Sequence, residues 1–247
     1  MLRIAYLRNK LGAVTRLSSP LERGRVSLRG GRGVLAIIAI ALLLTSCSKK
    51  PTDKFLPYYN TPDFTPLFLD NEADVYRQVN HTIAPFTFTD QDKKQVTEKT
   101  INGKIHVADF IFTSCGSICP VMTEQMSRVG KAFEKDTSVV ILSYSVTPWI
   151  DNPDKLKAYK EAKGIKKADW HFLTGNKSAI YNLARQSYFA EESLGFTKDS
   201  TQFLHTEHFV LVDASKRIRG IYNGTLQLEA EQLIKDIYRL KNEKLDE

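Results

Sequence analysis

Two cysteines, Cys115 and Cys119, lie four positions apart in the segment ADFIFTSCGSICPVMTEQM. An apolar run ends at Phe112, and Pro120 is a residue type common in the first turn of a helix. We therefore expect both thiols at a strand-to-helix junction, where unpaired backbone N–H groups and the helix dipole favour thiolates. Two thiolates so close together can close a disulfide or bind one soft metal ion.

Two other interpretations of this pair remain open. The cysteines could form a structural disulfide or stay buried as unreactive thiols, although a disulfide across so short a loop restricts the unfolded chain little. A structural zinc site is the second alternative. Such sites usually have four ligands with two short spacings, whereas the segment supplies one thiol pair.

The five histidines are candidates for a third metal ligand. His81, His106 and His171 lie within or beside apolar segments, which is more typical of structural histidines. His205 and His208 precede the apolar run FVLVD, a strand that we expect close to the cysteine loop. Two thiolates and one imidazole form a soft set of three donors that suits copper.

The elements that must position these residues alternate between strands and helices. Strands are predicted at 86–89, 105–112, 139–146, 170–173, 209–213 and 218–222, and helices at about 120–133, after the Asn152-Pro153 cap, after Asn176 and at the C-terminal end. Crossover helices followed by a terminal hairpin predict an α/β, thioredoxin-like fold with extra N-terminal strands and a late β-hairpin insertion. No glycine-rich phosphate loop or acid-rich calcium loop is present in the sequence.

The basic charge of the chain is concentrated at its start. Residues 1–33 contain eight Lys or Arg and one Glu, whereas the other residues contain 27 basic and 27 acidic side chains. The sequence pI of about 9.2 therefore comes from the leader and does not indicate nucleic-acid binding. The apolar run 34–44 is about half as long as the roughly 20 residues of a membrane-spanning helix, so a signal peptide is favoured over a short permanent anchor.

The sequence Leu44-Thr45-Ser46-Cys47 resembles a bacterial lipobox, which implies that Cys47 is acylated and begins the mature chain. We expect a lipoprotein signal peptide at 1–46, a tether at 47–84 and a thioredoxin-like domain at 85–247. The lipid anchor would hold the domain on the extracytoplasmic side of a membrane in a bacterial cell envelope. Thiols in that compartment can be oxidised.

Residues from about 85 to 241 resemble the Sco/SenC family of thioredoxin-like copper proteins, which help assemble the binuclear copper centre of cytochrome c oxidase. The matching stretches are FTFTDQDKKQVT, DFIFTSCGSICP, SYSVTP, WHFLTG and HTEHFVLVDASKRIRGIYNG. The resemblance implies that copper binds Cys115, Cys119 and a histidine before the late hairpin. The spacing from the Tyr-Asn-Gly at 222–224 assigns that role to His205 rather than His208. The implied partners are the apo copper-bearing subunit of the oxidase and a copper donor protein.

This chain departs from the family pattern at two positions: Gly116 replaces a usual proline and Thr147 replaces a usual acid. The leading interpretation is a membrane-tethered metallochaperone, which needs no enzymatic step. The alternative is a thiol-disulfide oxidoreductase, in which Cys115 and Cys119 form and resolve a mixed disulfide. A structural envelope lipoprotein with a degenerate site is disfavoured because all three donors are present.

Overall fold

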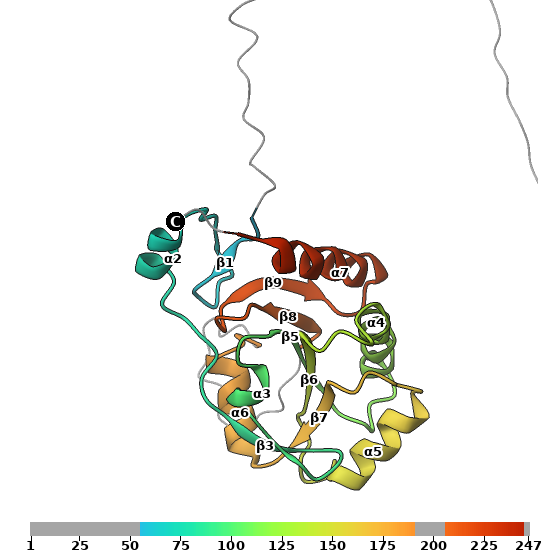
Figure 1. Ribbon diagram of the computed structural model, residues 1–247. Helices are drawn as coiled ribbons and strands as arrows, with labels where there is room; N and C mark the ends of the chain where they lie inside the picture. The colour runs from blue at the N-terminus through green and yellow to red at the C-terminus, as the bar shows by residue number, and fades with distance from the viewer. Residues whose placement is uncertain (1–54, 191–205, 245–247) are drawn as a thin grey trace, which may run out of the picture. The chain divides into compact units, whose positions relative to one another are not determined.

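The computed structural model describes residues 55–190 and 206–244, all within one unit that spans residues 50–247. These residues form a mixed sheet with the strand order β2-β1-β9-β8-β5-β6-β7-β3-β4 (Figure 1). The strands are β1 (Tyr58–Tyr59), β2 (Pro66–Leu67), β3 (Thr87–Asp90), β4 (Gln95–Thr97), β5 (Ile105–Ile111), β6 (Val139–Ser145), β7 (Trp170–Thr174), β8 (His208–Val212) and β9 (Ile218–Asn223).

The centre of the sheet is built from β5, β6 and β7, which run parallel to one another, and from β8, which runs antiparallel to β5. Every residue of β5 and β6 is buried, as expected for continuous apolar strands that are covered on both faces. Because the three parallel strands end at the same edge, the loops that follow β5 and β6 lie next to each other.

Helices cover both faces of this sheet (Figure 1). The helices α4 (Ile118–Ala132), α5 (Pro153–Ala162) and α7 (Gln227–Asn242) share one apolar core with the sheet, whereas α3 (Glu98–Ile101) and α6 (Lys177–Gln186) share the other. The predicted thioredoxin-like α/β architecture with a late hairpin, β8–β9, is confirmed by this arrangement. No helix among the described residues is long and apolar enough to cross a membrane.

The predicted helix starts are confirmed at two asparagines. The side chain of Asn152 accepts a hydrogen bond from the N–H of Lys155 (2.9 Å), and that of Asn176 accepts one from Ala179 (3.0 Å). The helix expected from Pro120 instead begins at Ile118, with Ser117 as its N-cap residue. Cys119 therefore lies inside the first turn of α4 rather than before it.

The structure departs from the sequence-based expectation most clearly at the N-terminal side of the domain. Residues 55–84 fall in the segment that we expected to be a tether, yet they contain β1, β2 and the helix α2 (Glu72–Gln78). Strand β1 joins the sheet edge through the pairing of Tyr59 with Ile218, and Tyr58 packs with Val75 and Val79 of the α2 region. The folded part thus begins no later than Phe55.

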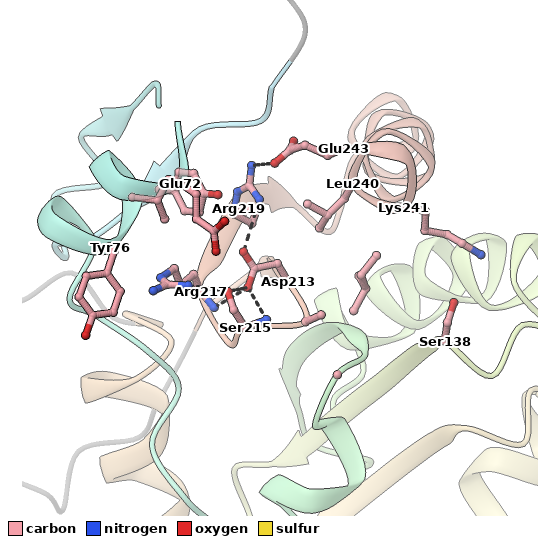
Figure 2. A pocket seen from close by; sticks show the side chains of 15 residues that line it. Glu72, Tyr76, Ser138, Asp213, Ser215, Arg217, Arg219, Leu240, Lys241 and Glu243 are labelled. Carbon is pink, nitrogen blue, oxygen red and sulfur yellow. Dashed lines mark hydrogen bonds and ion pairs between the residues drawn. The ribbon is translucent and has the colours of Figure 1, made fainter. Parts of the chain in front are cut away.

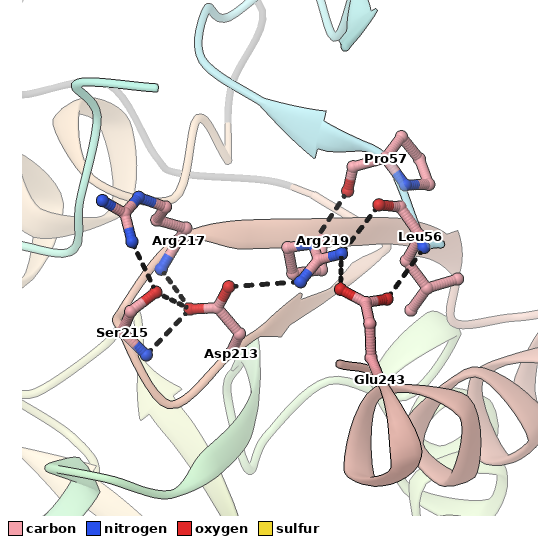
Figure 3. A network of polar contacts seen from close by, with 7 residues as sticks. All are labelled: Leu56, Pro57, Asp213, Ser215, Arg217, Arg219 and Glu243. Carbon is pink, nitrogen blue, oxygen red and sulfur yellow. Dashed lines mark hydrogen bonds and ion pairs between the residues drawn. The ribbon is translucent and has the colours of Figure 1, made fainter. Parts of the chain in front are cut away.

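A buried arginine connects residues 55–57 to the rest of the domain through hydrogen bonds and ion pairs (Figure 3). Arg219, on β9, is 2% exposed and donates hydrogen bonds to the carbonyl oxygens of Leu56 (2.7 Å) and Pro57 (3.1 Å). Its guanidinium also forms ion pairs with Asp213 and with Glu243 at the end of α7. These partners are far apart in sequence, which explains why periodicity did not reveal the attachment.

Candidate metal centre

Cys115 and Cys119 lie at the junction between β5 and α4, as the sequence predicts. The N–H of Cys115 donates to the carbonyl of Phe112 (3.2 Å), which closes the turn after the strand. The backbone N–H of Cys119 then donates to the sulfur of Cys115 (3.5 Å). Both residues are free thiols, and two adjacent sulfur donors fit two coordination positions of a soft metal ion.

The two thiols differ in their electrostatic surroundings. Burial disfavours the Cys115 thiolate, but hydrogen bonds from the backbone N–H groups of Cys119 and Ser117 outweigh it, so the pKa of Cys115 lies below its ordinary value. Burial instead raises the pKa of Cys119 to about 12, and its side chain is only 6% exposed. Cys115 is therefore the more accessible and more readily ionised member of the pair.

The third proposed ligand, His205, lies outside the described residues, as does the proposed lipidation site, Cys47. Within the described residues, no group of three or more His, Cys, Asp or Glu side chains could hold a metal ion. The neighbouring strand is nevertheless placed as expected. Val210 of β8 pairs with Ala108 of β5, so β8 begins near the end of β5 from which the cysteine loop leaves.

The histidines other than His205 and His208 make contacts typical of structural residues. The fully buried His106 hydrogen-bonds to the hydroxyl of Tyr188 (3.1 Å). His171 contacts the carboxylate of Asp90 (3.0 Å), and His81 contacts the carbonyl of Ser187 (2.8 Å). None of the three belongs to the cysteine loop.

Asp151 is a site residue that the sequence did not reveal. This fully buried carboxylate accepts hydrogen bonds from the backbone N–H (3.1 Å) and hydroxyl (2.5 Å) of Thr113, two residues before Cys115. It also accepts from the hydroxyls of Ser145 (2.7 Å) and Thr147 (3.0 Å). Thr147, which stands where the family usually has an acid, thus binds an acid four residues later in the chain.

The effect of these contacts is to tie the cysteine loop to the loop between β6 and α5. Burial would favour the protonated form of Asp151, but the hydrogen bonds from Thr113, Ser145 and Thr147 outweigh it, so its pKa lies below the ordinary value. Lys155 adds a second link, because its ammonium lies 3.5 Å from the Asp151 carboxylate and donates to the hydroxyl of Ser114 (2.9 Å).

A second acid missed by the sequence analysis is Asp109, on β5. Burial raises its pKa to about 7, against the opposing effect of a hydrogen bond with Ser143. Negative charge on Asp109 contributes in turn to the raised pKa of Cys119. The inner part of the site therefore disfavours excess negative charge unless a cation is bound there.

A cavity of about 500 Å³ lies elsewhere in the domain (Figure 2). Ile105 and Ser138 line it, and these residues lie at or before the starts of β5 and β6, opposite the end that carries the cysteines. Its other polar lining includes Glu72, Arg217 and Lys241. This cavity is therefore separate from the candidate metal centre.

Comparisons with known proteins agree with the resemblance seen in the sequence. A family model described as SCO1/SenC matches residues 74–242. The SCO1 protein homolog of Bacillus subtilis (strain 168) is 34% identical over 161 residues, which cover 64% of this chain and 82% of the relative.

Solved structures show the same fold over the domain. A SCO1/SenC family lipoprotein from Bacillus anthracis str. Ames is 32% identical with a TM-score of 0.57, covering 66% of this chain and 96% of that one. A second solved structure is that of BsSco, which is described as having a disulfide switch and as a member of the Sco family of cytochrome c oxidase assembly proteins. BsSco is 33% identical to this chain with a TM-score of 0.57, and the match covers 67% of this chain and 96% of BsSco. ScoI of Bradyrhizobium japonicum with copper bound is 28% identical with a TM-score of 0.51, and the match covers 64% of this chain and 99% of ScoI.

The family model covers more than half of the sequence, and the matched region includes β3 to α7 together with the cysteine loop. On these grounds the chain belongs to the SCO1/SenC family.

Proposed function

We propose that this protein binds copper and delivers it during assembly of the copper centre of a cytochrome c oxidase. The observation that carries the proposal is the pair of free thiols at the β5–α4 junction, one with a lowered and one with a raised pKa. Support comes from the copper-bound ScoI structure and from BsSco, which is described as belonging to a family of oxidase assembly proteins.

In this proposal Cys115, Cys119 and His205 hold the copper ion, which is cargo rather than a resident cofactor. Cys115 contributes the first thiolate because its pKa is lowered. Cys119 loses its proton as copper binds, since the buried thiolate is stable only when a cation neutralises it. Release to the oxidase subunit then proceeds by exchange of ligands, with no general acid or base.

The second candidate is a thiol-disulfide oxidoreductase, and the unequal thiols favour it as well. The thiolate of Cys115 would attack a disulfide of the partner, releasing one partner thiolate and forming a mixed disulfide. Cys119 would then attack the sulfur of Cys115, which releases the reduced partner and leaves a Cys115–Cys119 disulfide. BsSco, in which a disulfide switch is described, supports this alternative.

Copper titration with absorption spectroscopy tests the ligand set. We expect about one copper ion per chain, with His205→Ala weakening Cu(II) binding much more than His208→Ala. The two histidines are matched controls because they lie three residues apart before or at the start of β8. Equal effects of the two substitutions would exclude His205 as the specific ligand.

The two candidate functions separate in cells that express His205→Ala or Cys115→Ser. Both functions need Cys115, but disulfide exchange does not need the imidazole. Copper delivery predicts that the copper content of the oxidase falls in both variants at limiting copper. If His205→Ala supports normal oxidase assembly while Cys115→Ser does not, the thiol-disulfide oxidoreductase replaces the copper chaperone as the function.

A further inference from the structure

A groove with several basic side chains runs along α4, away from the cysteine motif. One hollow of about 690 Å³ is lined at one end by Pro120 and Val121, directly after Cys119. A second hollow, of about 280 Å³, is lined by Lys166, Lys167 and Trp170. Ser127, Lys131 and Lys163 line both hollows, so the two adjoin each other. We call the surface formed by these two hollows the basic groove.

The lysines at the rim of the basic groove are not neutralised by the domain. Lys131, Lys163 and Lys166 are exposed, and none forms an ion pair within the part of the chain that the structure describes. The three lysines of α5 differ, because each has a polar partner: Lys155 contacts Asp151, Lys157 contacts Asp92, and Lys160 donates to the carbonyl of Trp170. The three exposed lysines of the basic groove are therefore without an acidic ion-pair partner among the described residues.

The acids that line the basic groove leave an excess of positive charge. Glu124 lies 3.7 Å from the guanidinium of Arg128 in an i,i+4 pair, so those two charges offset each other. Glu134 is the other acid of the lining, against Lys131, Lys163, Lys166 and Lys167. Outside residues 1–33 the chain has equal numbers of acidic and basic residues, so this local excess is not a reflection of overall composition.

The floor of the basic groove is packed against the rest of the domain and contains a buried lysine. Lys167 is 2% exposed, and its ammonium donates to the carbonyls of Phe133 (2.8 Å) and Asp136 (2.9 Å), which account for two of its three N–H groups. Gly130 lets the α4 backbone approach the ring of Trp170, since a Cβ at this glycine would lie 3.2 Å from ring atoms. These contacts hold Lys167 and Trp170 in place at the floor of the second hollow.

We propose that the basic groove binds an acidic, extended segment of a protein partner. Three features favour this occupant: the lysines that form no ion pair among the described residues, the two adjoining hollows along α4, and their concave shape, which a flat membrane surface could not follow to its floor. The end of the basic groove at Pro120 and Val121 would place the bound partner beside Cys119. Binding of the acidic segment stands by itself, and its use in copper transfer rests on the proposed function.

Fluorescence anisotropy with the full-length protein in detergent tests the proposal. The probe is a fluorescein-labelled peptide rich in Asp and Glu, compared with the same peptide carrying Asn and Gln. We expect the acidic peptide alone to bind, and the double variant Lys131→Glu/Lys163→Glu to weaken its binding by about tenfold or more. The matched control is Lys94→Glu/Lys99→Glu, which changes the same charge at exposed lysines on β3–β4 and α3, and should alter binding by less than about twofold.

Each alternative gives a distinct result. Equal weakening by the two double variants means that only net charge matters and overturns the proposal. Full competition by inorganic phosphate at concentrations similar to those of the peptide would indicate a simple anion site, and selective binding to phosphatidylglycerol vesicles would indicate a membrane surface. Unfolding midpoints of the variants check folding. Copper titration of the same variants should be unchanged, so failure of the groove and failure of the copper site are distinguishable.

Discussion

Asp151 is the residue on which the geometry of the cysteine loop depends most directly. Its carboxylate accepts four hydrogen bonds, two of them from Thr113 in that loop. Asp151→Asn replaces one acceptor oxygen by a donor and removes the charge. We expect the free energy of unfolding to fall by about 2–3 kcal/mol. We also expect the alkylation of Cys115 by iodoacetamide at neutral pH to slow, because displacement of the cysteine loop weakens the hydrogen bonds from backbone N–H groups to the Cys115 sulfur.

The matched control for this prediction is Asp213→Asn. Asp213 is also a buried carboxylate that binds a turn, accepting from the N–H groups of Ser215 and Arg217 (both 2.9 Å), but it lies at the opposite end of the sheet. Its substitution should lower stability without changing the alkylation rate of Cys115. If both variants leave that rate at the wild-type value, Asp151 has a purely structural role.

His106 predicts a pH dependence of stability. Burial, with a smaller contribution from Lys216, lowers its pKa from 6.5 to about 3. The stability contributed by the neutral ring is therefore fully present above pH 6.5 and is lost as pH falls towards 3, at about 1.4 kcal/mol per pH unit.

The substitution His106→Gln removes this titration. The variant should be less stable than the wild type at pH 7.5, and the difference should shrink by about 2–3 kcal/mol on going to pH 4.5. Urea unfolding at several pH values measures it. A difference that stays constant across this range would show that His106 does not titrate differently in the folded and unfolded states.

Among the helices, α6 offers a test of the cap that the sequence predicted. The side chain of Asn176 accepts a hydrogen bond from the N–H of Ala179, so Asn176→Ala should lower the free energy of unfolding by about 1 kcal/mol. Asn182→Ala is the same substitution at an exposed position inside the helix, where it should be neutral or slightly stabilising. Urea denaturation of both variants distinguishes the cap from a general effect of losing an asparagine.

The elements that could be predicted from the sequence are those with strong local patterns. The runs that became β5 and β6 are apolar throughout because both faces are covered, and Asn152 and Asn176 are residue types that cap helices. Strand β4 and helix α3 were missed because each is short and buries a single apolar side chain. This side chain is Val96 in β4 and Ile101 in α3.

The same limit applies to the site. Cys115 and Cys119 could be found because their spacing is local, whereas Asp151 reaches Thr113 across 38 positions of sequence. Asp109 was hidden for a different reason: its position in the apolar run of β5 is visible, but the burial that raises its pKa depends on packing from the rest of the domain.

For the molecule as a whole, the buried network around Arg219 decides whether residues 55–84 stay attached. Arg219→Met would leave the carboxylates of Asp213 and Glu243 without this cation and two carbonyls without this donor. We expect a loss of about 3–5 kcal/mol of stability and faster proteolysis within residues 55–84. Arg77→Met is the control, because Arg77 is 72% exposed in its pair with Asp74 and should contribute less than about 1 kcal/mol.

The second prediction at this scale concerns the membrane. We propose that Cys47 is lipidated, with residues 1–46 removed, and the lipoprotein from Bacillus anthracis supports this. Cys47→Ser should block processing and release the protein from the membrane fraction. Intact mass of the membrane-extracted wild type is the decisive measurement: an unmodified amino terminus upstream of Cys47 would identify a permanent anchor instead.

The attachment of β1 also sets an order of events in time. Leu56 donates its N–H to Glu243, 187 residues later, and Arg219, which holds Leu56 and Pro57, follows them by more than 160 residues. A ribosome makes residues 55–67 before any other described part of the domain, yet their partners are among the last residues made. This edge of the sheet therefore stays unpaired while the rest of the domain is being synthesised, and it can form only after Arg219 and Glu243 have been added to the chain.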